Sequence, residues 1–278
     1  MRTDADRQYR ILIERLLSDD AEIIETRNHS VRRLSMPFLM IQFDSLPLIT
    51  YRKVAVKKAL REMEWFMSGD SKCPDELKDW WAGQLNEDGR YMYGYPDQLR
   101  YNRTSDFESF DQIKYILYGL RNNPNSRRLC LTTWNPGDMA NITETNGNPN
   151  TPSCCHLSFV QFFVSKGELS MLSYQRSCDA LLGLQHNWVQ HFALLTYFAY
   201  HANLKVGKMR WEVGDLHLYN EESHLEVANI IADAPYESIG SKPILNYVPS
   251  NGEQFLAKDF SVSWGAPEPL TTIRPKLL

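Results

Sequence analysis

The chain has 278 residues and a formal net charge of -4, from 30 lysines and arginines against 34 aspartates and glutamates. Hydrophobic residues make up 43% and charged residues 23%, a globular balance that excludes a disordered or collagen-like chain. The slightly acidic charge carries no broad positive footprint for duplex nucleic acid, so no nucleic-acid partner is expected. Because no repeat or linker interrupts this length, we expect a single domain over residues 1–278.

The sequence also bears on where the protein works. No apolar run reaches the roughly 20 residues that span a bilayer, and Met1–Arg10 is too polar for a signal peptide. The five cysteines, at positions 73, 130, 154, 155 and 178, match no zinc-binding spacing. We therefore expect a cytoplasmic protein with free thiols, no membrane partner and no metal.

Hydrophobic periodicity predicts the elements of the first half of the chain. Apolar residues at helical spacing predict one helix over residues 5–18 and another over 52–68, which Gly69 would end. Loosely alternating residues within 30–50 predict strands. Residues 70–107 are rich in glycine, asparagine, aspartate and aromatic residues, which indicates a long and functional loop.

The second half of the chain alternates predicted helices and strands. In chain order they are a helix at 109–121, a strand at 129–134, a hairpin of 157–165 and 168–175, an apolar helix at 188–202 and a strand at 205–219. Lys166-Gly167 is the predicted turn of the hairpin, residues 135–153 form a polar loop, and the tail from Pro243 mixes strand and loop. Elements in this order favour an α+β fold.

Cys155-His156 follows the polar loop and opens an apolar strand. A cysteine there can be an activated thiolate when positive charge lies nearby, although a lone cysteine is more often a small buried hydrophobe. Side chains alternate along an extended strand, so only one of Cys154 and Cys155 can point into a cleft. A thiol hydrolase would further need a base beside the cysteine, whereas His156 would lie on the opposite face.

Two arginine segments flank predicted strands. Arg127-Arg128 precede one strand and Arg176 follows another, where guanidinium groups suit phosphate; surface ion pairing is the alternative. Asn187 lies in a turn before the apolar helix. Its carboxamide could donate and accept at once, which matches the cis amide edge of uracil, or it could cap the helix.

These residues belong to a larger set of segments, namely Tyr174–Asp179, Leu182–Leu184 with Asn187, Asn125–Arg128 with Trp134-Asn135, Glu62, Tyr93-Gly94 and Gly214–Tyr219. Together these segments resemble a known family, the thymidylate synthases. They follow in the family's order and cover roughly residues 20–260. The resemblance implies an α+β, thymidylate synthase-like fold, with a large twisted mixed β-sheet packed against helices and the sheet forming a dimer interface.

The resemblance also implies covalent one-carbon chemistry. Cys155 would add to C6 of a pyrimidine nucleotide, and C5 would then attack the one-carbon unit of 5,10-methylene-tetrahydrofolate, a cosubstrate used without a metal. The other implied catalytic residues are Glu62, Tyr93, Asp179, Asn187 and His217. Implied nucleotide-binding residues are Arg27, Arg127, Arg128, Arg176 and Ser177 at the phosphate, Asn187 at the base, and His217 and Tyr219 at the ribose. Implied folate-binding residues are Asp179, Gly183 and either Trp80 or Trp81. In the implied homodimer, Arg127 and Arg128 would reach the partner's site.

Departures from the synthase pattern gather on the one-carbon side of the implied site. Cys154 replaces a proline, Gln185-His186 replaces Pro-Phe before Asn187, and bulky Trp188 follows. The tail from Arg274 also differs. This pattern resembles the phage-type hydroxymethylase branch, in which water instead of hydride captures the methylene on C5 and tetrahydrofolate is the product. His186, Gln185 and Glu64 are candidates to place that water.

We therefore expect a dUMP hydroxymethylase, because Asn187 suits uracil whereas members that act on dCMP carry an aspartate there. A thymidylate synthase, which would make dTMP and dihydrofolate from the same substrates, is the main alternative. A dCMP or CMP hydroxymethylase is a third interpretation. A catalytically inactive homologue that binds nucleotide or RNA is a fourth, although binding would need no nucleophile such as Cys155.

Overall fold

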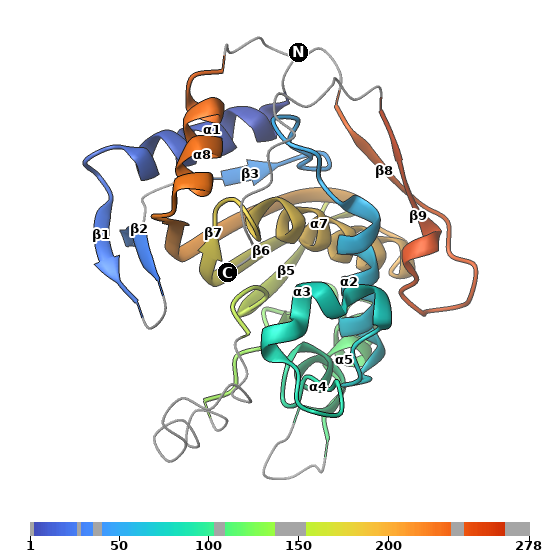
Figure 1. Ribbon diagram of the computed structural model, residues 1–278. Helices are drawn as coiled ribbons and strands as arrows, with labels where there is room; N and C mark the ends of the chain where they lie inside the picture. Colours follow the sequence, from blue (N-terminus) through green and yellow to red (C-terminus); the bar gives the residue numbers. More distant parts are fainter. Residues whose placement is uncertain are drawn as a thin grey trace.

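A seven-stranded mixed β-sheet runs through the middle of the protein (Figure 1). The computed structural model describes residues 3–26, 29–35, 41–102, 109–136, 154–234 and 242–264. Within these residues the strand order is β1 (Glu22–Glu25), β2 (Ser30–Ser35), β7 (Lys205–Tyr219), β6 (Glu168–Asp179), β5 (Phe159–Ser165) and β4 (Cys130–Leu131), and β3 (Ile41–Phe43) also pairs with β7. A separate antiparallel pair consists of β8 (Ile244–Tyr247) and β9 (Phe260–Ser263). The expected α+β fold with a large mixed sheet is confirmed.

β5 and β6 form the hairpin that the sequence predicts. Lys166 and Gly167 at its turn have φ angles of 51° and 77°, the left-handed values that a tight two-residue hairpin turn needs. β6 then pairs in parallel with β7, and helix α7 (Leu184–His201) makes the crossover between them. Because parallel strands end at the same edge of a sheet, the ends of β6 and β7 place Asp179 opposite His217.

The two faces of the β5–β6 hairpin differ in burial. On one face Phe162 is buried, and its ring packs against Phe198 of α7 with centroids 5.0 Å apart. Side chains alternate along a strand, so the next positions point away from α7, and there Phe159, Phe163 and Tyr174 are exposed. The outer face of this part of the sheet is therefore apolar and uncovered in the single chain.

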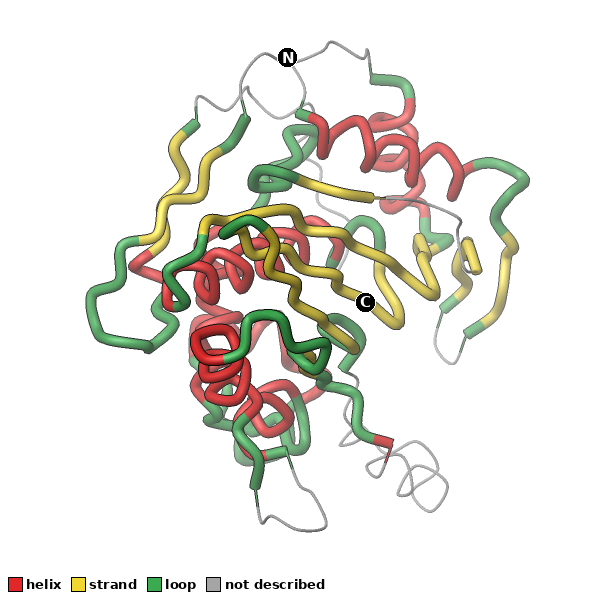
Figure 2. The backbone as a smooth tube through the Cα atoms, turned by 180° about the vertical axis from the view of Figure 1, so that it is seen from behind, coloured by secondary structure: helices red, strands yellow, loops and turns green. Residues whose placement is uncertain are grey.

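Two groups of helices flank the sheet. At the β1–β2 end, α1 (Asp4–Leu17) packs on α8 (Glu222–Ala232) and on β2 (Figure 2). At the other end, α2 (Val56–Ser68) packs on both α7 and α4 (Tyr95–Tyr101), and α4 packs on α5 (Gln112–Asn122). The short helical segments are η1 (Asp75–Leu77), α3 (Lys78–Trp81), η2 (Ala82–Gln84) and η4 (Ala257–Asp259).

The residues predicted as one long loop contain several of these helical segments. Between residues 70 and 102 the chain forms η1, α3, η2 and α4, so the loop interpretation is wrong there, and residues 103–108 lie outside the described residues. Each helix is too short for a hydrophobic repeat to reveal it. Among the other elements, β1 and α8 were not predicted, and the predicted helix over 52–68 begins only at Val56. It ends at Gly69 as expected, with a φ of 81°.

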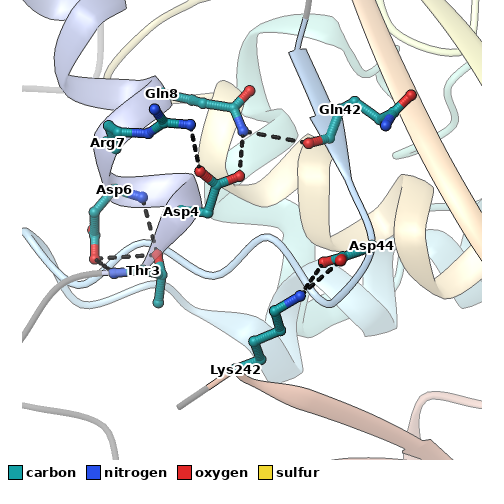
Figure 3. A network of polar contacts seen from close by, with 8 residues as sticks. All are labelled: Thr3, Asp4, Asp6, Arg7, Gln8, Gln42, Asp44 and Lys242. Atoms are coloured by element: carbon teal, nitrogen blue, oxygen red, sulfur yellow. Dashed lines mark hydrogen bonds and ion pairs between the residues drawn. The ribbon is translucent and has the colours of Figure 1, made fainter. Parts of the chain in front are cut away.

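The N-terminal helix is anchored by a buried carboxylate. Thr3 and Asp6 exchange hydrogen bonds in a capping box, which starts α1 one residue before the predicted position (Figure 3). Asp6 is fully buried and also accepts from the backbone nitrogen of Thr50 at 2.6 Å. An ion pair of 2.7 Å between Lys242 and Asp44 lies nearby (Figure 3). None of the helices in the described residues is long and apolar enough to cross a membrane.

Candidate active site

Cys155 lies in the segment that leads into β5, and the Tyr95 hydroxyl holds this segment in place. The backbone nitrogens of Cys155 and His156 donate to the Tyr95 oxygen at 2.7 and 3.2 Å. These two bonds occupy the oxygen's lone pairs, so its single proton is free for the Cys155 sulfur, which is 3.6 Å away. Burial, and then the negative charge of Cys155, raise the pKa of Tyr95, which keeps the hydroxyl protonated.

The two adjacent cysteines lie in different surroundings, although the strand expected to open at Cys155 begins only at Phe159, and Leu157 before it has a φ of 53°. Cys154 is buried at 2% exposure, and its sulfur is 3.9 Å from the Tyr91 hydroxyl. Cys155 is only partly buried. The Cys155 carbonyl also accepts from the backbone nitrogen of Arg176 at 2.8 Å, which joins the cysteine segment to the predicted phosphate-binding segment. Cys155 is therefore the better candidate nucleophile of the two.

His156 points away from the Cys155 sulfur into a buried histidine pair. Its Nδ1 lies 3.3 Å from Nε2 of His191, and Nδ1 of His191 lies 3.2 Å from the Ser173 hydroxyl. Burial lowers the pKa of His156 to about 3, so the ring is neutral. This arrangement argues against a thiol hydrolase, which would need a base aimed at the cysteine.

Glu62 is a buried carboxylate held by two neutral donors. Trp81 Nε1 donates to one carboxylate oxygen at 2.5 Å, and Gln190 Nε2 donates to the other at 2.6 Å. Burial raises the pKa of Glu62 to about 7, although both donors act to lower it. The Trp81 ring lies 6.2 Å from that of Tyr95, so this carboxylate belongs to the surroundings of Cys155. A group of this pKa can take or give a proton near neutral pH.

The neighbouring tryptophans, which the sequence could not distinguish, have different surroundings. Trp81 is 7% exposed and is committed to Glu62. Trp80 is partly exposed, with its ring 4.9 Å from that of His186 and the Lys58 ammonium 4.6 Å from its centroid. Of the two, Trp80 is therefore the ring that a ligand could pack against.

Asp179 ends β6 and has one carboxylate oxygen to spare. Its Oδ1 accepts from the backbone nitrogens of Leu181 and Leu182 at 2.7 Å each, which orients the side chain. Its Oδ2 is buried and has no hydrogen-bond partner among the described residues. The Gly183 nitrogen donates to the Asp179 carbonyl at 3.3 Å, and α7 begins directly after Gly183. A ligand with an N–H group would satisfy this oxygen.

Asn187 does not cap α7, so that alternative is wrong. Gly183 is at the N-cap, and Asn187 lies one turn inside the helix with its nitrogen bonded to the Gly183 carbonyl at 3.0 Å. Asn187 is 8% exposed, and its carboxamide makes no hydrogen bond to the described residues. A nearly buried amide without a protein partner is suited to bind a ligand with both a donor and an acceptor.

The predicted phosphate-binding arginines are placed differently from one another. The Arg176 guanidinium lies over the Trp134 ring at 5.1 Å, and its Nε is buried without a partner in the described residues. Arg127 and Arg128 are exposed. Ser177 follows Arg176 in β6 and pairs with Asp215 of β7. Arg27 lies outside the described residues.

His217 and Tyr219 lie on β7, next to the end of β6. His217 Nδ1 is 2.8 Å from Asp215 Oδ1, which orients the imidazole, and the rings of His217 and Tyr219 are 5.7 Å apart. Burial, then the negative charges of Asp179 and Cys155, raise the pKa of Tyr219. Tyr219 therefore lies within electrostatic reach of both the candidate nucleophile and Asp179.

Sequence reasoning named Tyr93 and missed Tyr95. Tyr93 is 41% exposed, has a φ of 57°, and donates its backbone nitrogen to Asp97 at 2.6 Å. Tyr95 is 2% exposed and contacts the cysteine segment directly. The two tyrosines are two residues apart, and only the path of the chain before α4 decides which one reaches Cys155. No local sequence signal distinguishes them.

The residues expected to place a water on the one-carbon side are largely committed elsewhere. Gln185 donates its amide to the Leu181 carbonyl at 2.6 Å and to the Leu182 carbonyl at 3.2 Å. Trp188, a departure from the synthase pattern that was not expected to place the water, is fully buried in the core, with ring centroids 4.8 Å from Phe43 and 5.6 Å from Trp211. His186 has its Nδ1 2.9 Å from the Leu182 carbonyl and accepts at Nε2 from the Ala55 nitrogen at 3.4 Å.

Glu64 is likewise occupied. It pairs with Arg61 at 2.9 Å and accepts from the Ala257 nitrogen at 2.8 Å. Within the described part of the chain, there is no group of three or more His, Cys, Asp or Glu side chains that could hold a metal ion.

Comparison with known proteins agrees with this arrangement. The sequence profile of the thymidylate synthase family matches residues 7–270. The thymidylate synthase of Buchnera aphidicola subsp. Acyrthosiphon pisum (strain Tuc7) is 37% identical over 185 residues, 66% of each chain. That of Corynebacterium aurimucosum is 38% identical over 189 residues, 66% of this chain and 65% of the relative. The matches thus span just under two thirds of these relatives. With a profile that matches nearly its whole length, the chain belongs to the thymidylate synthase family.

Proposed function

We propose that this protein is an enzyme that transfers a one-carbon unit from 5,10-methylene-tetrahydrofolate to C5 of dUMP, and that water capture yields 5-hydroxymethyl-dUMP. The observation that carries the transfer is the partly exposed Cys155 thiol, which accepts from the Tyr95 hydroxyl and is tied by its backbone to Arg176. A nucleophile thus lies next to a cation suited to phosphate.

The nucleotide would be held along the ends of β6 and β7. Arg176 and Ser177, with Arg27, would bind the 5′-phosphate, while His217 and Tyr219 would bind the ribose. The Asn187 carboxamide would pair with the N3–H and O4 edge of uracil, which needs one acceptor and one donor. The missing side-chain partner of Asn187 supports this role.

The described residues fit the folate cosubstrate. The unpartnered Oδ2 of Asp179 suits an N–H group of a pterin, and the accessible Trp80 ring suits a flat ring system. A Cβ on Gly183 would lie 3.6 Å from both the Asp179 carbonyl oxygen and the Asn187 amide nitrogen, so this glycine lies between the proposed folate-binding and base-binding residues. The folate, when bound, supplies a one-carbon unit at the oxidation level of formaldehyde. These residues would position that unit beside C5.

The side chains around Cys155 would each perform one step on the base. The thiolate adds to C6, which moves the C5–C6 electron pair toward C5 and makes C5 nucleophilic. Tyr95 donates to the sulfur and so stabilises the thiolate before addition and after release. Glu62, whose pKa of about 7 allows both protonation states, moves protons at the base.

Two observations support water capture over hydride transfer. The sequence departures at Cys154 and Gln185-His186 resemble the hydroxymethylase branch. The Glu62–Gln190 pair, bonded at 2.6 Å, would also put polar groups next to the reacting base, where a water could be ordered. Reductive methylation to dTMP is the second candidate, because the relatives described above are named thymidylate synthase. Hydroxymethylation of dCMP is a lesser candidate, since Asn187 suits uracil.

A homodimer would complete the phosphate site. The exposed Phe159, Phe163 and Tyr174 form an apolar outer face on the sheet, which a second copy would cover. Arg127 and Arg128 are exposed, which leaves them free to reach the partner's nucleotide. We propose that each subunit is a single cytoplasmic domain and that two subunits form the homodimer. Analytical ultracentrifugation tests the dimer, because a monomer at micromolar protein concentration would contradict it.

The product decides between the two main candidates. Purified protein, dUMP and 5,10-methylene-tetrahydrofolate should give 5-hydroxymethyl-dUMP by mass spectrometry, without the rise in absorbance that dihydrofolate formation causes. A dTMP product with dihydrofolate formed one-for-one would make this a thymidylate synthase. The same assay with dCMP tests the choice of base, and Cys155→Ala is the negative control.

A further inference from the structure

Helix α7 carries three polar side chains on one side although most of the helix is buried. Asn187, Gln190 and His191 are three and four residues apart, the spacing that places side chains on one helical face. Gln190 donates to Glu62, and His191 lies 3.3 Å from His156. This polar face of α7 is therefore directed toward the groups that surround Cys155.

The amide orientation of Gln190 is fixed by two acceptors. Its Nε2 donates to the Ala59 carbonyl at 3.0 Å and to Glu62 at 2.6 Å. A flipped amide would put its oxygen against the Ala59 carbonyl and the Glu62 carboxylate. Neither group can donate a hydrogen bond to that oxygen when Glu62 is ionised. The positions of Nε2 and Oε1 are therefore assigned by the surrounding hydrogen bonds.

The Oε1 atom of Gln190 is buried and has no hydrogen-bond partner among the described residues. Gln190 itself is fully buried, and buried carbonyl oxygens are nearly always paired. Because Oε1 and Nε2 belong to one amide, a single water could contact both Oε1 and Glu62. The buried Oε1 of Gln185 is also unpartnered, but the Gln185 amide donates to the Leu181 and Leu182 carbonyls and not to Glu62.

We propose that Gln190 is a positioning residue that holds, through Oε1, the water that captures the methylene on C5 while Glu62 accepts the water's proton. This inference rests on the proposed hydroxymethylation. The water oxygen bonds to the exocyclic methylene carbon. The electron pair of the double bond between that carbon and C5 moves into the C4–C5 bond, and the C4 carbonyl electrons move onto O4, which gives an enolate. The enolate then re-forms the C5–C6 double bond as the C6–sulfur bond breaks, which releases Cys155 as a thiolate. No oxidant or reductant is consumed.

The experiment compares Gln190→Met, which keeps the length of the side chain, with the wild type. Product is measured by mass spectrometry with and without 2-mercaptoethanol, which would trap an uncaptured methylene as a thioether. We expect the rate of 5-hydroxymethyl-dUMP formation to fall roughly tenfold or more, a thioether to appear, and dUMP affinity by calorimetry to stay within about twofold. Loss of the Nε2 donor should also move the acidic limb of the rate–pH profile upward, because that donor lowers the pKa of Glu62.

Two further variants separate positioning from folding. Thr196→Val removes a buried polar group from α7, a hydroxyl that donates to the Phe192 carbonyl, and should leave the product and the pH profile unchanged. Gln190→Glu keeps an oxygen acceptor and should retain more hydroxymethyl product than Gln190→Met. Equal products from Gln190→Met and the wild type would overturn the inference, as would equal losses of turnover and dUMP binding. A wild-type enzyme that makes dTMP would instead overturn the proposed function.

Discussion

Asp179 and His217 lie opposite each other on the neighbouring parallel strands β6 and β7, and the His217 carbonyl accepts from the Ala180 nitrogen at 2.8 Å. This pairing ties the proposed folate-binding carboxylate to the proposed ribose-binding imidazole. A shift of β7 by one residue in its register with β6 would turn His217 to the face of the sheet opposite Asp179. These two residues are therefore held at the ends of two central strands, which position side chains more rigidly than loops do.

The two adjacent cysteines should behave differently when each is replaced. Cys155→Ala should reduce turnover by many powers of ten while dUMP binding survives, because the phosphate and base contacts lie on other residues. Cys154→Ala should keep substantial activity, since Cys154 is buried beside Tyr91. Product assays and calorimetry with dUMP measure both effects. If Cys154→Ala were the inactive variant, Cys155 would not be the nucleophile.

Tyr95→Phe should impair the enzyme more than Tyr93→Phe. The Tyr95 hydroxyl accepts two backbone N–H groups and donates to the Cys155 sulfur, and the loss of a buried acceptor costs about 1–3 kcal/mol. We expect a lower melting temperature together with slower alkylation of Cys155 by iodoacetamide near neutral pH. Tyr93 is exposed and serves as the matched comparison. A larger effect at Tyr93 would point to that residue as the functional tyrosine.

Asn187→Asp should change the choice of base. The carboxylate, or its acid form, can face the 4-amino group of cytosine but matches the uracil edge poorly. A mismatched polar contact in a buried site costs about 1–3 kcal/mol, which corresponds to a loss of roughly ten- to a hundredfold with dUMP. Competition assays with dUMP and dCMP measure the ratio. Unchanged selectivity would show that Asn187 does not contact the base.

The contribution of Glu62 to the free energy of unfolding should decrease as the pH rises through the weakly acidic range. Burial raises its pKa from 4.5 to about 7, so between these values the folded state holds a proton that the unfolded state has lost. The free energy of unfolding should therefore fall as the pH rises from about 4.5 to 7, by on the order of 3 kcal/mol from this group. Glu62→Gln should lack this contribution.

Urea titrations of the wild type and Glu62→Gln across that range measure the difference. Parallel pH dependence in the two proteins would mean that the folded-state pKa of Glu62 is not raised. Because Glu62→Gln also removes the proton acceptor, its turnover should fall at every pH, which separates the catalytic effect from the effect on stability.

Local patterns in the sequence were enough to predict the long elements and the main chemical groups. The helix at 5–18, the hairpin turn at Lys166-Gly167 and the strand at 205–219 depend on periodicity and turn chemistry within a few residues. The different burial of Cys154 and Cys155 was expected from alternation along a strand, but the segment lies before β5, so its contacts with Tyr91 and Tyr95 set that difference.

Contacts between distant segments decided the rest. Whether Tyr93 or Tyr95 reaches Cys155 depends on packing between residues about 60 positions apart, which no local pattern records. Trp80 and Trp81 are adjacent, and only the position of Glu62 on α2 commits Trp81 to the interior. Gln190 offered no motif at all, because its role comes from a carboxylate 128 residues earlier in the chain. The role of a buried polar group depends on its hydrogen-bond partners, and only folding brings those partners together.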